Sequence, residues 1–146
     1  TVLLLITLVA PFLRQQLIVG TLVNAALFLA VLLVGFRKAL FLGFLPSSIA
    51  LISGILPWVF FPVIPFIILA NAVLILVFAA FVKSNYWVAV VIASFLKFVF
   101  LYGCIFFCFS PAIAIAGYLQ LCTAILGGLL AFSINLMTKK NMDHSN

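Results

Sequence analysis

The chain has 146 residues, of which 69% are hydrophobic and 5% charged, and seven Lys and Arg residues against one acidic residue give it a net charge of +6. This composition excludes an ordinary water-soluble domain, because most of the apolar surface would stay in contact with water. We therefore expect a lipid bilayer around the chain, where backbone polar groups must be bonded internally and only helices or closed barrels can span. Barrel strands alternate apolar and polar residues, whereas the runs here are apolar throughout, so helices are favoured.

Six apolar runs predict an all-α, polytopic membrane protein, a bundle of about six transmembrane helices. The predicted helices cover residues 1–13, 17–36, 39–56, 65–82, 86–109 and 112–137. Most have the roughly 20 residues that a span needs, but the first is short, and the third, which contains Pro46, has a re-entrant segment as its alternative. Residues 57–65 hold three prolines and predict a loop. Residues 1–137 thus form a single transmembrane domain, and residues 138–146 form a polar tail.

Basic residues at the ends of the runs predict which way the bundle faces. Two lysines at 139 and 140 end the last helix, which places the C-terminus in the cytoplasm by the positive-inside rule. Crossing the membrane at each helix brings Lys83 and the basic pair at 37 and 38 to the same side, and only Arg14 falls outside. We expect both termini in the cytoplasm. Topology and phospholipid contact account for the charge, so nucleic acid is not an expected partner.

Two predicted helices each carry a side chain that lipid would reject, Asn71 in one and Lys97 near the middle of the next. At about 1.5 Å per residue, Asn71 lies about 9 Å, Asn24 about 12 Å and Lys97 about 18 Å from the outer ends of their helices. Ser94 lies one turn from Lys97 on the same face. Because most of these groups share the outer half of the bundle, we expect a polar cavity that opens to the outside, with Lys97 at its floor.

Lys97 has no carboxylate partner, because no predicted helix contains an acidic residue, and three roles for it stay open. It could bind an anionic group of a substrate. It could be neutral, or hydrogen-bonded to carbonyls and side chains such as Asn71. It could also extend to an interface or meet a partner subunit. Asn24 and Asn71 have their own alternative to cavity lining, since interhelical amide hydrogen bonds hold membrane bundles together.

The remaining candidates lie on other helices and in the proline-rich loop. One stripe of mostly small residues on the last helix predicts close helix packing (Ala116, Gln120, Thr123, Gly127 and Ala131). Tyr118 lies off that stripe and is the binding candidate there. Trp58 could cap the cavity or anchor the chain at the lipid interface, as aromatic residues near span ends do. Ala26 and Ala30 form a small-xxx-small pair that faces another helix or a partner subunit.

Residues for catalysis and for metal binding are scarce. The sequence has no phosphate-binding loop of the G-x-x-x-x-G-K-[ST] type. Its one histidine and one acid, His144 and Asp143, are neighbours in the tail, so general acid–base chemistry and carboxylate metal sites lack their residues. Cys104, Cys108 and Cys122 are expected to pack in the helices, with a thiolate site for a soft metal as the alternative. We expect no enzyme activity, no cofactor and no resident metal.

The arrangement resembles the substrate-binding S components of energy-coupling factor (ECF) transporters. The stretches that carry the resemblance are LVNAALFLAVLLVG, LPSSIALISGILP, PFIILANAVLILVF and NYWVAVVIASFLKFVFLY, which lie within residues 20–107. The resemblance implies capture of a vitamin or metal ion from outside a bacterial cytoplasmic membrane. It also implies association with a transmembrane T subunit, through small-residue faces such as Ala26 and Ala30, and with two cytoplasmic ATPase subunits. The N-terminal histidine arrangement of the nickel and cobalt members is absent, which favours a vitamin.

The function predicted from the sequence is that of a membrane-embedded subunit that binds a small water-soluble nutrient, vitamin-like and with an anionic group as one option. Two other functions stay open: a small homo-oligomeric channel or carrier, and a structural subunit of a larger membrane complex. The candidate binding residues are Lys97, Asn71, Ser94, Asn24, Tyr118 and Trp58.

Overall fold

The computed structural model describes residues 16–52, 62–108 and 116–143 of the chain. Within these ranges the protein is all-helical, with no strand, which confirms the all-α part of the predicted fold class, while the six spans and the orientation of the termini stay predictions. The described helices are α2 (Gln16–Val34), α3 (Phe36–Ile52), α4 (Ile64–Phe81), α5 (Tyr86–Cys108) and α7 (Ala116–Asp143). The predicted helix over residues 1–13 and most of the predicted proline-rich loop lie outside the described residues.

Local sequence signals explain where these helices begin and end. Gly35 alone separates α2 from α3, and it adopts φ +88°, a backbone conformation that side-chain-bearing residues rarely take. Pro65 lies in the first turn of α4, where the missing N–H costs nothing. Asn85 caps α5, because its Oδ1 accepts from the backbone N–H of Trp87 at 2.9 Å. Gly35 and Asn85 lie in the two short connections that the structure describes, α2–α3 and α4–α5, and Pro65 marks the start of α4.

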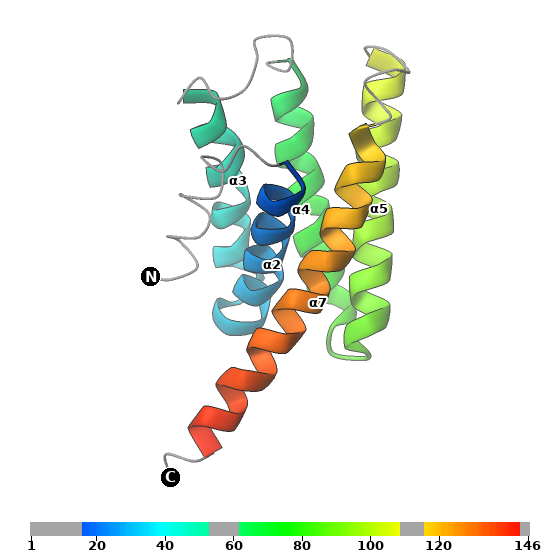
Figure 1. Ribbon diagram of the computed structural model, residues 1–146. Coiled ribbons are helices and arrows are strands. Elements are labelled where there is room, and N and C mark those ends of the chain that lie inside the picture. The colour runs from blue at the N-terminus through cyan, green and yellow to red at the C-terminus, as the bar shows by residue number, and fades with distance from the viewer. Residues whose placement is uncertain (1–15, 53–61, 109–115, 144–146) are drawn as a thin grey trace.

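Helix α7 is longer than the sequence analysis predicts. The predicted end was residue 137, but the helix continues to Asp143, so much of the segment described there as a polar tail is helical. The physical reason is that residues 129–143 contain neither glycine nor proline, and polarity alone does not end a helix. Figure 1 shows this end of α7 extending beyond the other helices.

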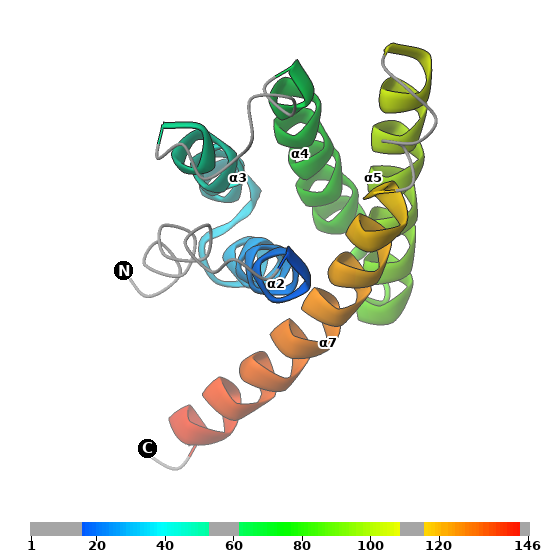
Figure 2. The same cartoon turned by 45° about the horizontal axis from the view of Figure 1, so that its top comes forward.

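The five described helices pack in a ring. Each contacts the next in the order α2, α3, α4, α5, α7, and α7 closes the ring on α2 (Figure 2). The α2–α3 turn, the α4–α5 turn and the C-terminal end of α7 all lie at the same end of the bundle, the lower end in Figure 1. This end carries the described basic residues other than Lys97, which are Arg37, Lys38, Lys83 and Lys140.

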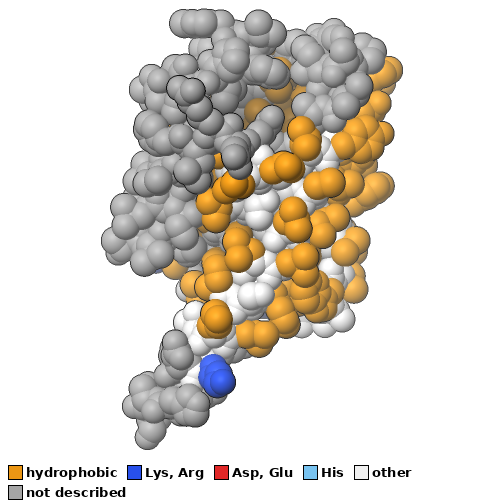
Figure 3. All heavy atoms as spheres, in the orientation of Figure 1, with side chains coloured by type: hydrophobic (Ala, Val, Ile, Leu, Met, Phe, Trp, Pro, Cys, Tyr) orange, Lys and Arg blue, Asp and Glu red, His pale blue; other side chains and the backbone are white. Residues whose placement is uncertain are grey.

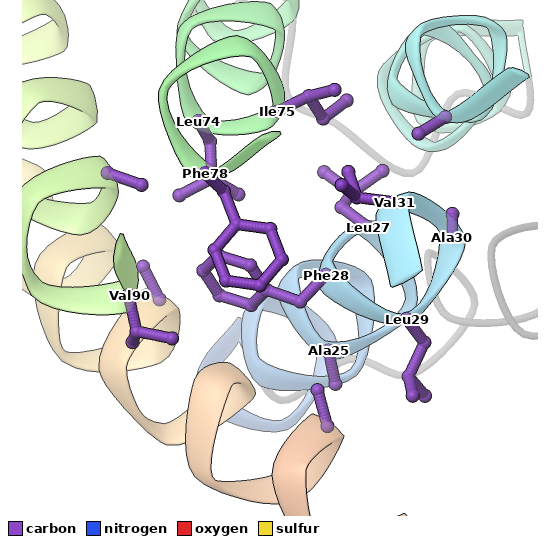
Figure 4. Close-up of a cluster of buried hydrophobic side chains, with 14 of the residues drawn as sticks. Ala25, Leu27, Phe28, Leu29, Ala30, Val31, Leu74, Ile75, Phe78 and Val90 are labelled. Carbon is purple, nitrogen blue, oxygen red and sulfur yellow. The ribbon is translucent and has the colours of Figure 1, made fainter. Parts of the chain in front are cut away.

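Aromatic and small side chains fill the ring towards its basic end. The rings of Phe28 and Phe78 meet edge to face with centroids 4.6 Å apart, as Figure 4 shows. Tyr86 packs on Phe78 and donates from its hydroxyl to the carbonyl oxygen of Gly128 at 2.7 Å. A Cβ at Gly128 would collide with Val90 of α5. Close approach of α7 to the α4–α5 hairpin therefore depends on the absence of a side chain at residue 128.

Four helices are long and apolar enough to cross a membrane: Leu17–Val34, Ile64–Phe81, Tyr86–Phe107 and Tyr118–Thr138. Helix α3 has 17 residues and lies among them. Large hydrophobic side chains cover the outer faces of the described helices, and Figure 3 shows one such face. These features indicate a multi-pass membrane protein. The structure supports four of the six predicted spans within the described part of the chain.

The contact between α2 and α7 gives a test of the packing. A Cβ on Gly127 would lie 2.7 Å from the Cβ of Asn24 and 2.8 Å from the backbone nitrogen of Ala25. The backbone cannot move aside without separating the two helices, so Gly127→Ala should destabilise the protein by about 1–3 kcal/mol. Unfolding in detergent micelles, followed by circular dichroism, measures this loss.

Gly103→Ala in α5 is the matched control for this substitution. Apart from its own turn of helix, no atom of the described residues lies within 4 Å of a Cβ at residue 103. The control should therefore keep or gain stability, by up to about 1 kcal/mol from helix propensity. Equal stability of the two variants would contradict the close α2–α7 contact.

Candidate functional site

Lys97 lies in the middle of α5 and points into the ring of helices. Its side chain is only 2% exposed. The Nζ atom donates one hydrogen bond to Oδ1 of Asn24 in α2 at 2.7 Å and another to Oδ1 of Asn71 in α4 at 2.8 Å. Lys97 thus joins three helices through two short hydrogen bonds, and both acceptors are neutral amides.

Asn24 extends these bonds to α7. Its Nδ2 atom donates to Oγ1 of Thr123 at 3.2 Å, and that hydroxyl donates in turn to the backbone oxygen of Gln120 at 3.0 Å. Asn24 and Thr123 are both buried. Gly127 lets α7 approach closely enough for this contact, because its missing side chain leaves room for Asn24. Thr123, Gly127 and Ala131 of the predicted small-residue stripe therefore serve helix packing, as expected from the sequence.

Asn71 extends the bonds to α3. Its Nδ2 atom donates to the backbone oxygen of Gly43 at 3.3 Å. A Cβ on Gly43 would lie 3.1 Å from Ile75 and 3.7 Å from Asn71, so glycine keeps the α3 backbone near α4 at this point. Through these links all five described helices meet in one polar network, formed by Lys97, Asn24, Asn71, Thr123 and the Gly43 carbonyl.

Ser94 is a buried polar residue outside this network. It lies one helical turn before Lys97 on α5 and is fully buried. Its hydroxyl is the buried side-chain group in the described part of the chain that lacks a hydrogen-bond partner. An unpaired buried hydroxyl costs free energy, about 1–3 kcal/mol from mutational data. Such a group next to a buried lysine marks hydrogen-bonding capacity that the protein itself leaves unused.

The polar network contains one basic side chain and no acidic side chain. The whole sequence has a single acidic residue, Asp143, at the far end of α7. An ammonium group at Lys97 would face amide dipoles only, and a buried charge without a counter-charge is costly. A neutral amine would retain two N–H donors, enough for the two hydrogen bonds to Asn24 and Asn71.

The described residues do not form the predicted cavity with Lys97 at its floor. Asn24, Asn71, Ser94 and Lys97 do come together as expected, but all four are 3% exposed or less. Their amide, hydroxyl and ammonium groups are covered by helices and, where possible, bonded to one another. Of the three roles considered for Lys97, the hydrogen-bonded one describes this state. Extension to an interface is excluded by its burial.

The other candidate residues lie away from this network or outside the described chain. Tyr118 is 54% exposed, and its ring contacts Phe98 and Tyr102 on the outside of α5 and α7. Ala26 and Ala30 are buried within the chain, so neither presents surface to a partner subunit in this structure. Trp58 lies outside the described residues.

Two members of the network were missed as site residues in the sequence analysis. Thr123 was assigned to helix packing, and the signal that could have found it is its place beside Gly127 on a stripe facing another helix. The Gly43 carbonyl is a backbone group, which residue types cannot reveal. Among the described residues no cluster of three His, Cys, Asp or Glu could hold a metal ion, and Cys104 and Cys122 are free thiols. The side chain of Cys108 lies outside the description.

No family model, curated protein or solved structure matches the chain, so its relation to the S components stays a prediction.

The network predicts a large effect of removing Asn71. Asn71→Ala leaves Lys97 with one acceptor and removes the donor to the Gly43 carbonyl. A hydrogen bond between membrane helices contributes about 0.6 kcal/mol on average, but an unpaired buried polar group costs about 1–3 kcal/mol. The second effect is the larger, and we expect a loss of about 1–3 kcal/mol in unfolding free energy, measured in detergent micelles.

Asn135→Ala provides the same chemical change at a partly exposed position of α7. Its effect should stay within about 0.5 kcal/mol, as for most substitutions away from buried contacts. If the two asparagine variants lost the same stability, the network around Lys97 would not be holding the helices together.

Proposed function

We propose that this chain is the membrane-embedded substrate-binding subunit of an uptake system for a small water-soluble nutrient, comparable to ECF S components and located in a bacterial cytoplasmic membrane. The observation that supports this proposal best is the buried group of Lys97, Asn24, Asn71 and Ser94. Polar and ionisable side chains at this depth are expensive and mark substrate pathways by default.

The chemistry of the group suits a polar solute. A water-soluble molecule must exchange its hydrogen bonds to water for bonds to protein when it enters the membrane. Asparagine amides both donate and accept, and lysine donates up to three hydrogen bonds. In the absence of a solute these side chains bond to one another, and in its presence they can turn to it. The described arrangement then corresponds to the closed, substrate-free state.

The source of energy must lie outside the chain in this proposal. The sequence has no phosphate-binding loop, and no acid or histidine lies within the described spans to couple transport to protons. A transmembrane T subunit and two ATPase subunits would supply the energy, as the resemblance implies. Since Ala26 and Ala30 are buried, the T subunit would bind elsewhere on the surface.

A structural role is the second candidate function. The two hydrogen bonds of Lys97 are satisfied by the chain itself. A subunit whose polar residues serve only to hold its helices together would look the same at these two asparagines. The unpaired hydroxyl of Ser94 is the feature that a purely structural network does not explain.

Ligand identification tests the proposal. We expect one small polar compound to co-purify with the native protein in mild detergent, and Lys97→Met to lose it because methionine fills the same volume without a donor. Mass spectrometry of the small molecules released from equal amounts of the two proteins makes the comparison, and Asn135→Ala serves as a control that should retain the compound.

A compound retained by the native protein and by Asn135→Ala, but not by Lys97→Met, would support the binding subunit. The absence of any enriched compound, together with a stable homo-oligomer, would favour a channel or carrier. If no compound were enriched and the chain were a monomer that joins a larger complex, the structural role would be favoured.

The distribution of basic residues predicts the orientation in the membrane. With the basic end in the cytoplasm, a cysteine at Ser84 should react with a membrane-impermeant maleimide only after the cells are opened. A cysteine at Pro62, at the start of α4, should react in intact cells. Both residues are exposed, and the three native cysteines are first replaced by alanine. The reverse pattern of labelling would invert the proposed topology.

A further inference from the structure

We propose that the compound bound at Lys97 carries a carboxylate, and that this carboxylate takes the position of counter-ion to Lys97 with a second contact from Ser94. This inference rests on the proposed function and names the class of its substrate. It follows from the charges and the unused hydrogen-bonding capacity of the buried group.

The charge balance of the bundle calls for an anion. Lys97 is buried in a span, and the only acidic residue of the sequence, Asp143, lies at the far end of α7. The described partners of Lys97 are two amide oxygens, which carry dipoles but no charge. A bound anion would turn an uncompensated cation into a neutral ion pair, whereas a neutral or cationic ligand would not.

The unused hydrogen-bond donors also favour an acceptor-rich ligand. An ammonium has three N–H donors, and Lys97 uses two of them within the described chain. Asn24 and Asn71 each donate one of their two amide hydrogens, to Thr123 and to the Gly43 carbonyl. The hydroxyl of Ser94 has no partner. With Lys97 in its ammonium form, which a bound carboxylate would stabilise, each of the four side chains retains a donor, and the carboxylate offers two oxygens with about four acceptor positions.

The single positive charge distinguishes a carboxylate from a phosphate ester. A phosphate monoester carries about −1.5 to −2 charges at neutral pH. Against one lysine it would leave up to one negative charge uncompensated in the membrane interior, where charges are costly. A carboxylate carries one negative charge and balances Lys97 alone.

Ser94 distinguishes ligand binding from a structural role. Its hydroxyl forms no hydrogen bond in the chain, so Ser94→Ala removes no contact that stabilises the fold. A hydrogen bond to a charged group, in contrast, typically changes affinity tenfold or more. Ser94→Ala should therefore weaken binding about tenfold while leaving the unfolding midpoint unchanged or higher.

The experiment offers the purified protein two mixtures. One is a metabolite extract of bacterial cells, and the other is the same extract after its carboxylates have been converted to N-methylamides. Mass spectrometry identifies compounds enriched on the native protein, with Lys97→Met and Ser133→Ala in parallel. Ser133 is exposed and donates to the carbonyl of Leu129 in its own helix, so Ser133→Ala should bind as the native protein does.

The expected result is a carboxylate compound enriched from the first mixture, absent from the second and lost in Lys97→Met. The proposal of a carboxylate ligand would be overturned, and the proposed function kept, if the enriched compound were neutral, were a phosphate ester or were enriched equally from both mixtures. Failure to enrich any compound from either mixture would overturn the proposed function itself. An unchanged affinity in Ser94→Ala would overturn the contact from Ser94.

Discussion

The two hydrogen bonds from Lys97 to Asn24 and Asn71 are the constraint on which the arrangement of the helices depends. Lipid cannot replace either bond, because the membrane interior offers no water to an exposed amide or amine. The three side chains must therefore meet, and α2, α4 and α5 must lie at the distance that lets them meet. Thr123 and the Gly43 carbonyl then bring α7 and α3 to the same point. A single lysine in this way fixes the register of five helices.

Towards the basic end the packing is mainly apolar, with one hydrogen bond from the Tyr86 hydroxyl to the Gly128 carbonyl. Phe28, Phe78 and Tyr86 fill the ring towards the basic end, and Gly128 lets α7 approach Val90. Above the polar network, the second buried cluster belongs to α4 and α5 alone, with Ala70 and Leu101 among its members. The polar network lies between these two apolar regions. Rearrangement of the network would therefore disturb the basic end least, because that end is held by close van der Waals contact.

The helices of the described residues, and the meeting of Lys97, Asn71 and Asn24, could be predicted because both follow from local composition. Apolar runs of about 20 residues define spans, and Lys97, Asn71 and Asn24 are conspicuous in such runs. The burial of these side chains and their bonds to one another, in place of an open cavity, were not predicted, because depth along a helix does not reveal rotation about its axis. The exposure of Tyr118 has the same cause, whereas the burial of Ala26 and Ala30 agrees with the expected contact with another helix. The continuation of α7 to Asp143 was missed because polarity was taken as the end of the helix.

In the proposed function the polar network would both hold the helices together and bind the substrate. If the chain binds a solute as proposed, some hydrogen bonds that stabilise the described bundle would have to be broken or shared, and they would subtract from the affinity. In the proposed site the amides of Asn24 and Asn71 would limit this cost, since each could donate its second amide hydrogen to the solute and keep its bond to Thr123 or to the Gly43 carbonyl. In the proposed site Ser94 would add a contact without the loss of an existing hydrogen bond, because its hydroxyl has no partner in the described chain. A binding site built from side chains that also hold the helices together would thus couple the binding of substrate to the packing of the whole bundle. A subunit that depends on other subunits for energy, as proposed here, would need such a coupling to signal that its substrate is bound.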